Sequence, residues 1–287
     1  SLGTNVSARN VCDRNHILHL RRYFYFKEHL ILVTELLEEN LYEFDCRIRQ
    51  NQNAPYFTMG RLSHITRQIL LALQYVHSLG LIHSDVKPEN IVMWSHRTAK
   101  VKLIDFGSAC FTTDHLSSYV QSRSYRAPEV VLGLPYSSKI DLWSLGCVIA
   151  ELFTGQVLFQ NESIIEMLAR IEATCGAFPK EMVLAGRKSG DYYLTSGLLY
   201  KENVTEENGE TVVLYDIYRP TRSNLAEKLG LNPSNRGEIE TMFLDFLSRL
   251  LTLDPLNRPT AKEALCHEWI VWGMSLSEDD VMYSSPN

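Results

Sequence analysis

The sequence lacks the features that mark disulfide-rich, metal-binding and membrane-spanning proteins. Six cysteines are scattered through 287 residues, with no C-x-x-C pair and no metal-ligand spacing, so neither a disulfide framework nor a zinc site is indicated. No apolar run approaches the roughly 18 residues of a membrane span, and no signal peptide is visible. We therefore expect reduced thiols in an intracellular protein of the cytoplasm or the nucleus, with no membrane partner.

An excess of basic charge is also absent. The chain carries 28 Lys and Arg residues against 34 Asp and Glu residues, for a formal net charge of −6, which argues against a nucleic-acid partner. None of the 15 glycines falls in a G-x-G-x-x-G pattern, and the first lysine is Lys27. The chain therefore contains neither a glycine-rich loop over nucleotide phosphates nor a V-A-x-K lysine upstream of Lys27.

The composition does provide for a core, because 45% of the residues are hydrophobic and 22% are charged. The length accommodates two packed lobes or subdomains. Apolar patterning predicts strands at 16–20, 21–27, 30–35, 91–94 and 101–104, and a hairpin within 198–216. It predicts helices at 41–50, 58–79, 127–131, 139–158, 163–175, 236–251 and 261–269.

Two short segments carry the residues with the clearest chemistry. The first is LIHSDVKPENIVMW at Leu81–Trp94, and the second is LIDFG at Leu103–Gly107. The apolar runs 91–94 and 101–104 predict a hairpin-like pair with Asn90 at one end and Asp105 at the other. This arrangement would bring the two side chains together, although fifteen residues separate them in sequence.

The residue types in these segments suit phosphoryl transfer. Asp85 can accept the hydrogen bond, and then the proton, of a substrate hydroxyl. Lys87 can place positive charge beside a moving phosphoryl group. Asn90 and Asp105 supply hard oxygen ligands, which suit Mg²⁺.

The pattern H-x-D-x-K-x-x-N followed by D-F-G resembles the signature of the eukaryotic protein kinases, roughly from His16 to Trp272. The resemblance implies an α+β, protein-kinase-like fold with a complete helical large lobe and a truncated small β lobe. It implies a remnant of the small lobe and hinge at 1–37, followed by the large lobe at 38–272 with an insert near 198–235. The remaining residues, 273–287, are expected to form a polar, poorly ordered tail.

Further motifs extend the resemblance along the chain. Ala127–Glu129 resembles the A-P-E motif that closes the activation segment, and Asp141–Gly146 resembles the buried helix that anchors the catalytic loop. Asp254–Pro259 resembles the loop whose arginine pairs with the A-P-E glutamate. The resemblance thus implies a buried ion pair between Glu129 and Arg258. Structural roles are implied for His83, Phe106, Gly107, Glu129, Asp141 and Arg258.

The segments QSRSYRAPE at 121–129 and DFGSAC at 105–110 resemble the dual-specificity tyrosine-regulated (DYRK) family of kinases. That resemblance implies that Tyr119 is the activation-loop tyrosine which the kinase phosphorylates on itself. Arg123 and Arg126 would then be able to hold the phosphotyrosine by charge-assisted hydrogen bonds.

ATP and Mg²⁺ are the cofactors that the resemblance implies. Thr34 resembles the gatekeeper at the end of its strand, and Glu35 and Leu37 fall where hinge backbone groups meet the adenine edge. Val92 and Ile104 would form the apolar floor beneath the adenine.

The substrate side of the site follows from the same resemblance. Ser122 matches the hydroxyl that bridges the catalytic acid and lysine in Ser/Thr kinases, which implies Ser and Thr acceptors in protein substrates. The resemblance assigns Glu89 to the nucleotide site, and its position beside the substrate channel would favour basic residues before the acceptor. We expect the protein to act as a monomer.

Three departures from the family pattern stand out. Ser84 replaces the arginine of H-R-D, where the DYRK family usually has cysteine, so the thiol pairing possible in that family retains only Cys110. Ser117 stands where the first tyrosine of Y-x-Y often lies, and Ser124 is small where an aromatic residue is common. The third departure is the missing glycine-rich loop and phosphate-gripping lysine.

Two alternatives to a protein kinase remain open at this point. A catalytically silent, kinase-like scaffold would explain the missing phosphate-gripping parts, whereas a small-molecule kinase fits poorly with the long segment before Ala127–Glu129. For residues 1–287 alone we expect weak or no ATP turnover. We also expect poor solubility, because apolar surface that the rest of a small lobe covers would be exposed.

Overall fold

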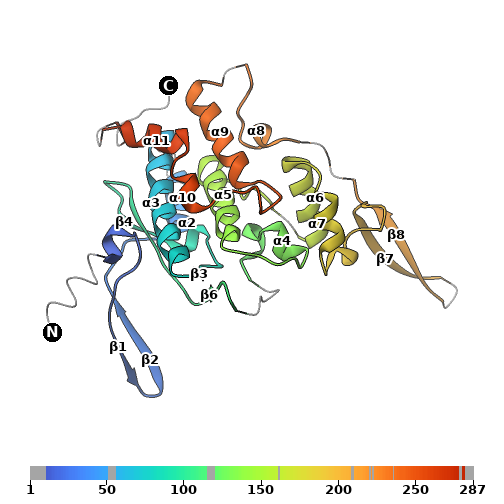
Figure 1. Ribbon diagram of the computed structural model, residues 1–287, viewed down its shortest axis with the longest axis horizontal. Helices are drawn as coiled ribbons and strands as arrows, with labels where there is room; N and C mark the ends of the chain where they lie inside the picture. Colours follow the sequence, from blue (N-terminus) through green and yellow to red (C-terminus); the bar gives the residue numbers. More distant parts are fainter. Residues whose placement is uncertain are drawn as a thin grey trace. The chain divides into compact units, whose positions relative to one another are not determined.

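A computed structural model describes residues 11–50, 56–114, 120–160, 162–207, 210–219, 221, 223–234, 236–277 and 280–281. The chain divides into two units, and Figure 1 labels their helices and strands. The first unit comprises Ser1–Thr113 together with Pro259–Asn287, and the second comprises Asp114–Arg258. Both units combine helices with strands, which confirms the expected mixed content.

The first unit contains Asp85, Lys87, Asn90 and Asp105, the residues predicted to carry the phosphoryl-transfer chemistry. Its helical elements are α2 (Leu41–Gln50), α3 (Met59–Ser78), the 3₁₀ turn η1 (Pro88–Asn90), α10 (Ala261–Ala264) and α11 (Glu268–Ser275). Its strands are β1 (Leu20–Phe26), β2 (His29–Thr34), β3 (Leu81–Ile82), β4 (Ile91–Ser95), β5 (Lys100–Leu103) and β6 (Cys110–Phe111).

Helix α3 is the central packing element of the first unit, and it confirms the helix predicted at 58–79. The hydroxyl of Thr58 caps its first turn by accepting the N–H of Arg61 at 3.4 Å. The chain leaves the helix at Gly80, whose φ of +75° suits a residue without a side chain. Helices α10 and α11 pack against α3. At Gly273 of α11 an added Cβ would lie within 2.6 Å of the Ser63 Cβ, so only glycine permits this approach.

Strands β4 and β5 form the predicted antiparallel hairpin, with Ile91 paired to Leu103. A segment at 16–18 joins β5 on its other edge: Ile17 forms a parallel bridge with Leu103, and the Leu103 N–H donates to the His16 carbonyl at 2.8 Å. Strands β3 and β6 pair antiparallel, with Ile82 opposite Cys110. These pairings tie together three stretches that are distant in sequence.

The prediction of separate strands at 16–20 and 21–27 was wrong. Residues 16–18 add to β5, while β1 begins at Leu20 and pairs with β2 through a turn at Lys27 and Glu28, which have φ of 45° and 66°. The helix predicted at 41–50 and the strand predicted at 30–35 are confirmed by α2 and β2. Side chains of the β1–β2 hairpin are exposed along β1, with Tyr23 at 67% and Tyr25 at 74%.

The second unit is built around α5. Its helical elements are η2 (Arg123–Tyr125), α4 (Pro128–Val131), α5 (Lys139–Thr154), α6 (Ile164–Cys175), α7 (Lys180–Ala185), η3 (Ser189–Asp191), α8 (Leu225–Lys228) and α9 (Glu238–Leu250). Its strands are β7 (Tyr200–Glu207) and β8 (Glu210–Ile217).

Helix α5 is buried on most faces, as predicted, but it ends at Thr154 and not at Leu158. Gly155, with a φ of +76°, adopts the left-handed conformation that terminates the helix. A Cβ at Gly146 would lie 3.0 Å from the Leu251 side chain, so this glycine allows the end of α9 to approach closely. In the parts of the chain that the structure describes, no helix has both the length and the apolar character needed to cross a membrane.

The hairpin predicted within 198–216 is confirmed by β7 and β8, whereas its turn residues Asn208 and Gly209 lie outside the described residues. The single helix predicted at 261–269 is two helices, because His267 caps a new helix by accepting the Trp269 N–H. The predicted boundary at 273 falls inside α11, which ends at Ser275, and Val281 is buried.

The half-buried imidazole of His16 makes the stability of the first unit dependent on pH. The pKa of His16 is lowered from 6.5 to about 4, chiefly by burial and in smaller part by the nearby charges of Arg67, His64 and Lys102, while a hydrogen bond with the backbone of Val101 opposes the shift. The unfolded chain therefore binds more protons than the folded chain between these two values. The stabilisation is fully present above pH 6.5 and is lost as the pH falls toward 4.

We expect the free energy of unfolding to fall between about pH 7 and about pH 5, with His16 contributing about 1 kcal/mol after allowance for its partial exposure. Urea titrations at the two pH values would measure the change. His16→Gln should reduce the pH dependence by that amount, because glutamine does not titrate. His29→Gln, on the exposed β1–β2 hairpin, is the matched control, and an equal reduction in both variants would contradict the assignment.

Candidate active site

His83 positions the chain at the start of the candidate catalytic loop. Its side chain is fully buried, and its Nδ1 accepts the backbone N–H of Asp85 at 3.3 Å. Because an N–H can only donate, the neutral ring must carry its proton on Nε2, which donates to the Ile104 carbonyl at 2.9 Å. The ring also contacts Phe106 edge to face, with centroids 5.0 Å apart. His83 thus links the Asp85 loop to the D-F-G segment, in keeping with its predicted structural role.

Two of the predicted functional side chains, those of Lys87 and Asn90, contact the carboxylate of Asp85. The Lys87 Nζ lies 2.7 Å from the Asp85 Oδ2, and both side chains are partly exposed, at 22% and 14%. The amide of Asn90 donates from Nδ2 to the Asp85 carbonyl at 2.8 Å and to its Oδ2 at 3.1 Å. The carboxylate is therefore held in place by neighbours while it retains access to solvent.

Asp105 reaches the same site through the β4–β5 hairpin. It follows β5 directly, and the N–H of Ile104 donates to the carbonyl of Asn90 at 2.9 Å. Asp105 adopts a φ of +60°, and its Oδ1 accepts the N–H of Gly107 at 3.1 Å. This confirms that the hairpin brings Asn90 and Asp105 to neighbouring positions.

The residues at this site fit a magnesium ion. Because the Nδ2 of Asn90 is bound to Asp85, the amide presents Oδ1 as its remaining polar atom. Asp105 is exposed, and only its Oδ1 takes part in the bond to Gly107. An amide oxygen and a carboxylate are the hard oxygen donors that Mg²⁺ prefers.

Thr34 and Glu35 stand at the end of β2, where the hinge was expected. The Thr34 hydroxyl donates to the Glu35 carbonyl at 3.0 Å. Residues 38–40 pair with β4, since the Glu38 N–H donates to the Met93 carbonyl at 2.9 Å and Asn40 bridges Val92. These bonds place the hinge segment beside β4.

The adenine-site predictions have a mixed outcome in burial. Val92 is buried on β4 with 8% exposure, and Leu37 and Ile104 are half-buried. Leu36, between the two hinge residues that were predicted, is 93% exposed. The described geometry is compatible with an adenine floor at Val92 and Ile104, whose role stays a prediction. Glu89, in η1, is exposed, and its role is likewise untested.

Sequence reasoning missed a buried ionic cluster beneath the hinge. Lys102 of β5 is fully buried, and its Nζ lies 2.6 Å from the carboxylates of both Glu35 and Asp13. The ammonium also lies 4.5 Å from the centre of the Trp94 ring. Glu35 accepts the His19 N–H at 2.8 Å as well. The signal was a lysine within the apolar run of β5, because such a residue needs charged partners when buried.

Ser84 and Cys110 are neighbours, at the two positions where the DYRK family could pair two cysteine thiols. Ser84 is fully buried with a φ of +64°, and its Oγ lies 3.6 Å from the Cys110 Sγ. Serine at this position therefore contributes a weak hydrogen bond between the catalytic loop and β6. All six cysteines are free.

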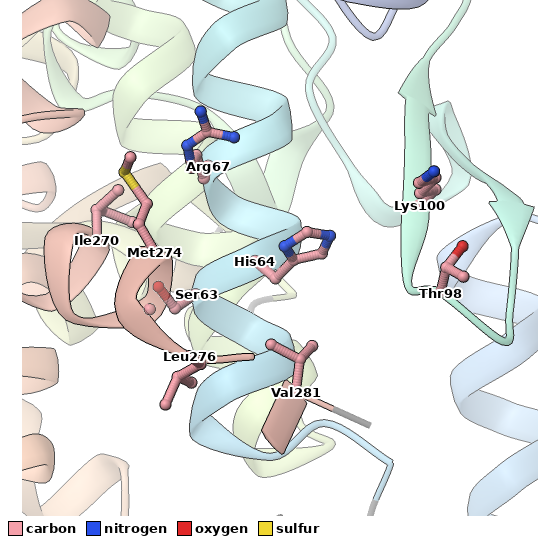
Figure 2. Close-up of a pocket in the computed structure, with 10 residues that line it drawn as sticks. Ser63, His64, Arg67, Thr98, Lys100, Ile270, Met274, Leu276 and Val281 are labelled. Carbon is pink, nitrogen blue, oxygen red and sulfur yellow. The ribbon is translucent and has the colours of Figure 1, made fainter. Parts of the chain in front are cut away.

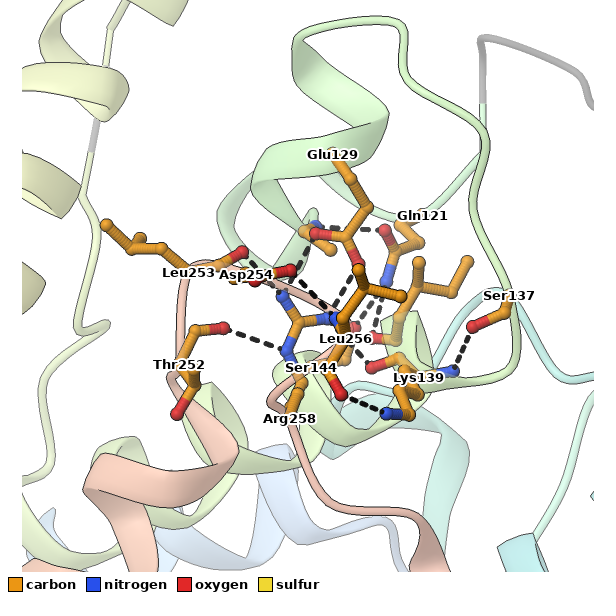
Figure 3. Close-up of polar contacts among 12 residues, drawn as sticks. Gln121, Glu129, Ser137, Lys139, Ser144, Thr252, Leu253, Asp254, Leu256 and Arg258 are labelled. Carbon is orange, nitrogen blue, oxygen red and sulfur yellow. Dashed lines mark hydrogen bonds and ion pairs between the residues drawn. The ribbon is translucent and has the colours of Figure 1, made fainter. Parts of the chain in front are cut away.

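The second unit contains the predicted ion pair between Glu129 and Arg258. Both side chains are fully buried, and the two nitrogens of Arg258 lie 2.6 and 3.0 Å from the two oxygens of Glu129. Arg258 also donates to the Thr252 and Lys139 carbonyls at 3.1 and 3.0 Å, as Figure 3 shows. The guanidinium lies 5.2 Å from the centre of the Trp143 ring. Every side of this buried cation has a partner, as burial demands.

Gln121 anchors the segment before A-P-E to α5 (Figure 3). Its Nε2 donates to the Ile140 carbonyl at 3.0 Å and to the Ser144 hydroxyl at 2.7 Å, while its Oε1 accepts the Ala127 N–H. Ser144 in turn donates to the Tyr125 carbonyl at 2.7 Å. Sequence reasoning assigned no role to Gln121, and a glutamine amid polar residues offers no signal for one.

The remaining predicted residues are distributed as follows. Tyr119 and Ser117 lie outside the described residues. Ser122 belongs to the second unit, and its role beside Asp85 stays a prediction. Asp141 is fully buried in the first turn of α5. Gly107 is exposed.

The two arginines that were predicted to hold a phosphotyrosine differ in their surroundings. Arg126 donates to the carbonyls of Val120 and Gln121 at 2.9 and 2.8 Å, so part of its hydrogen-bonding capacity is used within its own segment. Arg123 is exposed.

Comparison with known proteins supports assignment to the protein kinases. The family described as Protein kinase domain matches residues 3–270. The chain is 37% identical over 255 residues to dual specificity tyrosine-phosphorylation-regulated kinase 4 of Homo sapiens. The aligned region covers 89% of this chain and 45% of that protein. The chain is 35% identical over 255 residues to probable serine/threonine-protein kinase dyrk2 of Dictyostelium discoideum, covering 89% and 26%. It is 37% identical over 263 residues to dual specificity tyrosine-phosphorylation-regulated kinase 3 of Rattus norvegicus, covering 89% and 43%.

The fold and the site define a protein kinase domain. The chain belongs to the protein kinase family and is a DYRK-like member of it. It spans less than half the length of each of these three relatives.

The buried ion pair predicts a large effect of a single substitution. Arg258→Met should lower the free energy of unfolding by about 3–5 kcal/mol, because it leaves the Glu129 carboxylate buried without its partner. Replacing both residues, Glu129→Leu with Arg258→Met, should cost less than Arg258→Met alone, since no buried charge remains. Urea unfolding monitored by circular dichroism would measure all three proteins.

The control for this experiment is Arg249, which forms an exposed i, i+4 pair with Asp245 at 2.9 Å. Arg249→Met should change the free energy of unfolding by about 0.5 kcal/mol or less. Equal effects of Arg249→Met and Arg258→Met would contradict the role assigned to burial.

Proposed function

We propose that this chain is the catalytic part of a kinase that transfers the γ-phosphoryl group of ATP to Ser and Thr hydroxyls of protein substrates. The observation that carries the proposal is the convergence of Asp85, Lys87 and Asn90. A backbone hydrogen bond joins Asn90 to Ile104, the residue directly before Asp105. A protein that only binds partners has no need for this combination of groups.

Each side chain has a defined task in the proposed reaction. Asp85 accepts the hydrogen bond of the substrate hydroxyl, orients its oxygen toward the phosphorus and receives its proton. Lys87, 2.7 Å from Asp85, neutralises charge on the transferred group. His83 keeps the loop in position through its bonds to Asp85 and Ile104.

Asn90 and Asp105 would hold Mg²⁺ through oxygen atoms. When bound, Mg²⁺ supplies charge neutralisation to the phosphate oxygens. The hydrogen bonds of Asn90 to Asp85 align the amide for this role before the ion binds.

We include phosphorylation of Tyr119 by the kinase itself in the proposal. The names of the relatives in Homo sapiens and Rattus norvegicus describe dual specificity and regulation by tyrosine phosphorylation, and the QSRSYRAPE segment supports the transfer of that property to this chain. Arg123 is exposed and lies four residues after Tyr119, so its guanidinium can bind the phosphate of a phosphorylated Tyr119.

The proposal extends to a small lobe that is represented here only in part. The β1–β2 hairpin supports it, because large apolar side chains such as Tyr25, Leu30 and Leu32 are exposed at 74%, 50% and 59%. On this view residues 1–287 alone turn over ATP weakly or not at all, and they associate through the exposed hairpin unless it is covered. The absent glycine-rich loop also leaves a catalytically silent scaffold as the competing function. An intracellular, monomeric enzyme remains part of the proposal.

A phosphotransfer assay on the full-length parent tests the function. With ATP, Mg²⁺ and a generic basic protein, we expect phosphoserine and phosphothreonine on the substrate and phosphotyrosine at Tyr119, each identified by mass spectrometry. Asp85→Asn should lower kcat by about 10²–10⁴-fold, because the amide cannot accept the proton. The thermal midpoint of the variant should stay close to that of the wild type.

Asp191→Asn, at an exposed position of η3 in the second unit, is the matched control and should retain wild-type turnover. A folded full-length protein without phosphotransfer would favour the scaffold, and undiminished turnover in Asp85→Asn would remove Asp85 from the mechanism. A peptide array with the active protein tests Glu89 separately: we expect a preference for Arg or Lys before the acceptor.

A further inference from the structure

A cavity of about 310 Å³ lies in the first unit, apart from the residues that carry the proposed chemistry. Its walls come from α3, from the turn of the β4–β5 hairpin, from α11 and from the segment that follows α11 (Figure 2). Its size is at the lower end of the range for ligand pockets, about 300–1,000 Å³. It would accommodate one or two large side chains of a bound chain.

One side of the cavity is basic. His64 and Arg67 are three residues apart on the same face of α3, and Lys100 begins β5 across the opening (Figure 2). Asp280, on the segment after α11, keeps its negative charge, because the hydroxyl and the N–H of Ser277 donate to its carboxylate at 2.7 and 3.1 Å and lower its pKa. One carboxylate offsets only part of the positive charge of Arg67 and Lys100. In a chain with a net charge of −6, this cationic edge favours an anionic partner.

The opposite side of the cavity is apolar. Ile270 and Met274 are four residues apart on α11, and Leu276 and Val281 continue the wall. Ile270 and Val281 are buried, but Met274 is 57% exposed and Val271 is 52% exposed. The apolar surface therefore continues out of the cavity and along α11.

We propose that this cavity binds a short peptide segment in which acidic residues flank a bulky apolar side chain, and that the segment belongs to a protein substrate. The apolar side chain enters the space beside Ile270 and Met274, and the carboxylates meet Arg67 and Lys100. The apolar surface outside the cavity selects a chain that extends over α11, whereas a compact amphiphile would leave that surface uncovered. The assignment to a substrate rests on the proposed kinase function, but the assignment of a binding site does not.

The β4–β5 hairpin relates this cavity to the catalytic residues. Lys100 stands at the turn end of the hairpin, while Asn90 and Asp105 stand at its other end. Strands of this length separate the two ends by about 15 Å, at 3.3 Å per residue. A substrate with at least about five residues between the docking segment and the acceptor hydroxyl would reach both sites.

Binding of a defined probe tests the proposal. The probe is a fluorescein-labelled peptide with the sequence Glu-Asp-Glu-Leu-Phe-Glu-Asp, and its binding to the full chain is followed by fluorescence anisotropy. We expect saturable binding that weakens with added salt, because part of it is electrostatic. A peptide with Lys in place of each acidic residue should not bind.

Variants separate the two sides of the cavity. Arg67→Gln combined with Lys100→Gln should weaken binding about tenfold, as expected for the loss of two partly exposed charge contacts. Met274→Asn should also weaken it, through loss of the apolar contact. Lys262→Gln removes an exposed charge from α10 of the same unit and should leave affinity unchanged.

The outcomes distinguish this proposal from the proposed function. Asp85→Asn should bind the probe as tightly as the wild type, whether or not phosphotransfer occurs. In the active parent, the Arg67→Gln, Lys100→Gln variant should raise KM for a substrate that carries the acidic–apolar segment. Its kcat, and its turnover of a short acceptor peptide without the segment, should be unchanged.

Absence of probe binding to a folded wild-type protein would overturn the proposal. Equal weakening by Lys262→Gln, or equal binding of the Lys-substituted peptide, would overturn it as well, since either result means non-specific attraction. Binding of a simple fatty acid such as laurate in place of the peptide would assign the cavity to another ligand.

Discussion

Ile104 joins the two halves of the candidate active site through both of its backbone groups. Its N–H donates to the carbonyl of Asn90, and its carbonyl accepts the Nε2 proton of His83. The other ring nitrogen of His83 holds the N–H of Asp85, and the amide of Asn90 holds the Asp85 carboxylate. Because Asp105 follows Ile104 directly, the positions of the acid, the amide and the second acid all depend on this one strand end. The β4–β5 register is therefore the constraint on which the proposed chemistry depends.

Among the residues that the structure describes, each unit contains a fully buried cation whose partners come from distant parts of the chain. Lys102 joins β5 to the hinge residue Glu35 and to Asp13, and Arg258 joins the end of the second unit to Glu129. Neither cluster needs to add net stability, because desolvation offsets much of the Coulomb attraction. A buried charge without its partners carries a large free-energy cost. Both clusters therefore favour the one packing of the joined segments in which the partners are present.

The departure from the kinase pattern at Ser84 leaves the contacts among Asp85, Lys87 and Asn90 intact. Ser84 occupies the place of the H-R-D arginine, and its hydroxyl meets Cys110 without any charge. An arginine-based link between that position and a phosphorylated activation segment is thus not available. The segment that precedes A-P-E is held instead by neutral contacts, since Gln121 binds both the Ala127 N–H and the Ser144 hydroxyl. These contacts form without phosphorylation.

The sequence by itself determined the local elements and the identity of the chemical groups. The periodicity of α3, the hairpin formed by β4 and β5, and the spacing of Asp85 from Asn90 are properties of short stretches, and the structure confirms them. Tertiary structure decided what depends on contacts between distant stretches. Residues 16–18 pair with β5 and not with β1, because a strand pairs with the edge that the whole fold makes available to it. The carboxylate partners of the buried Lys102 lie far away in sequence, because the fold determines which acidic side chains reach it.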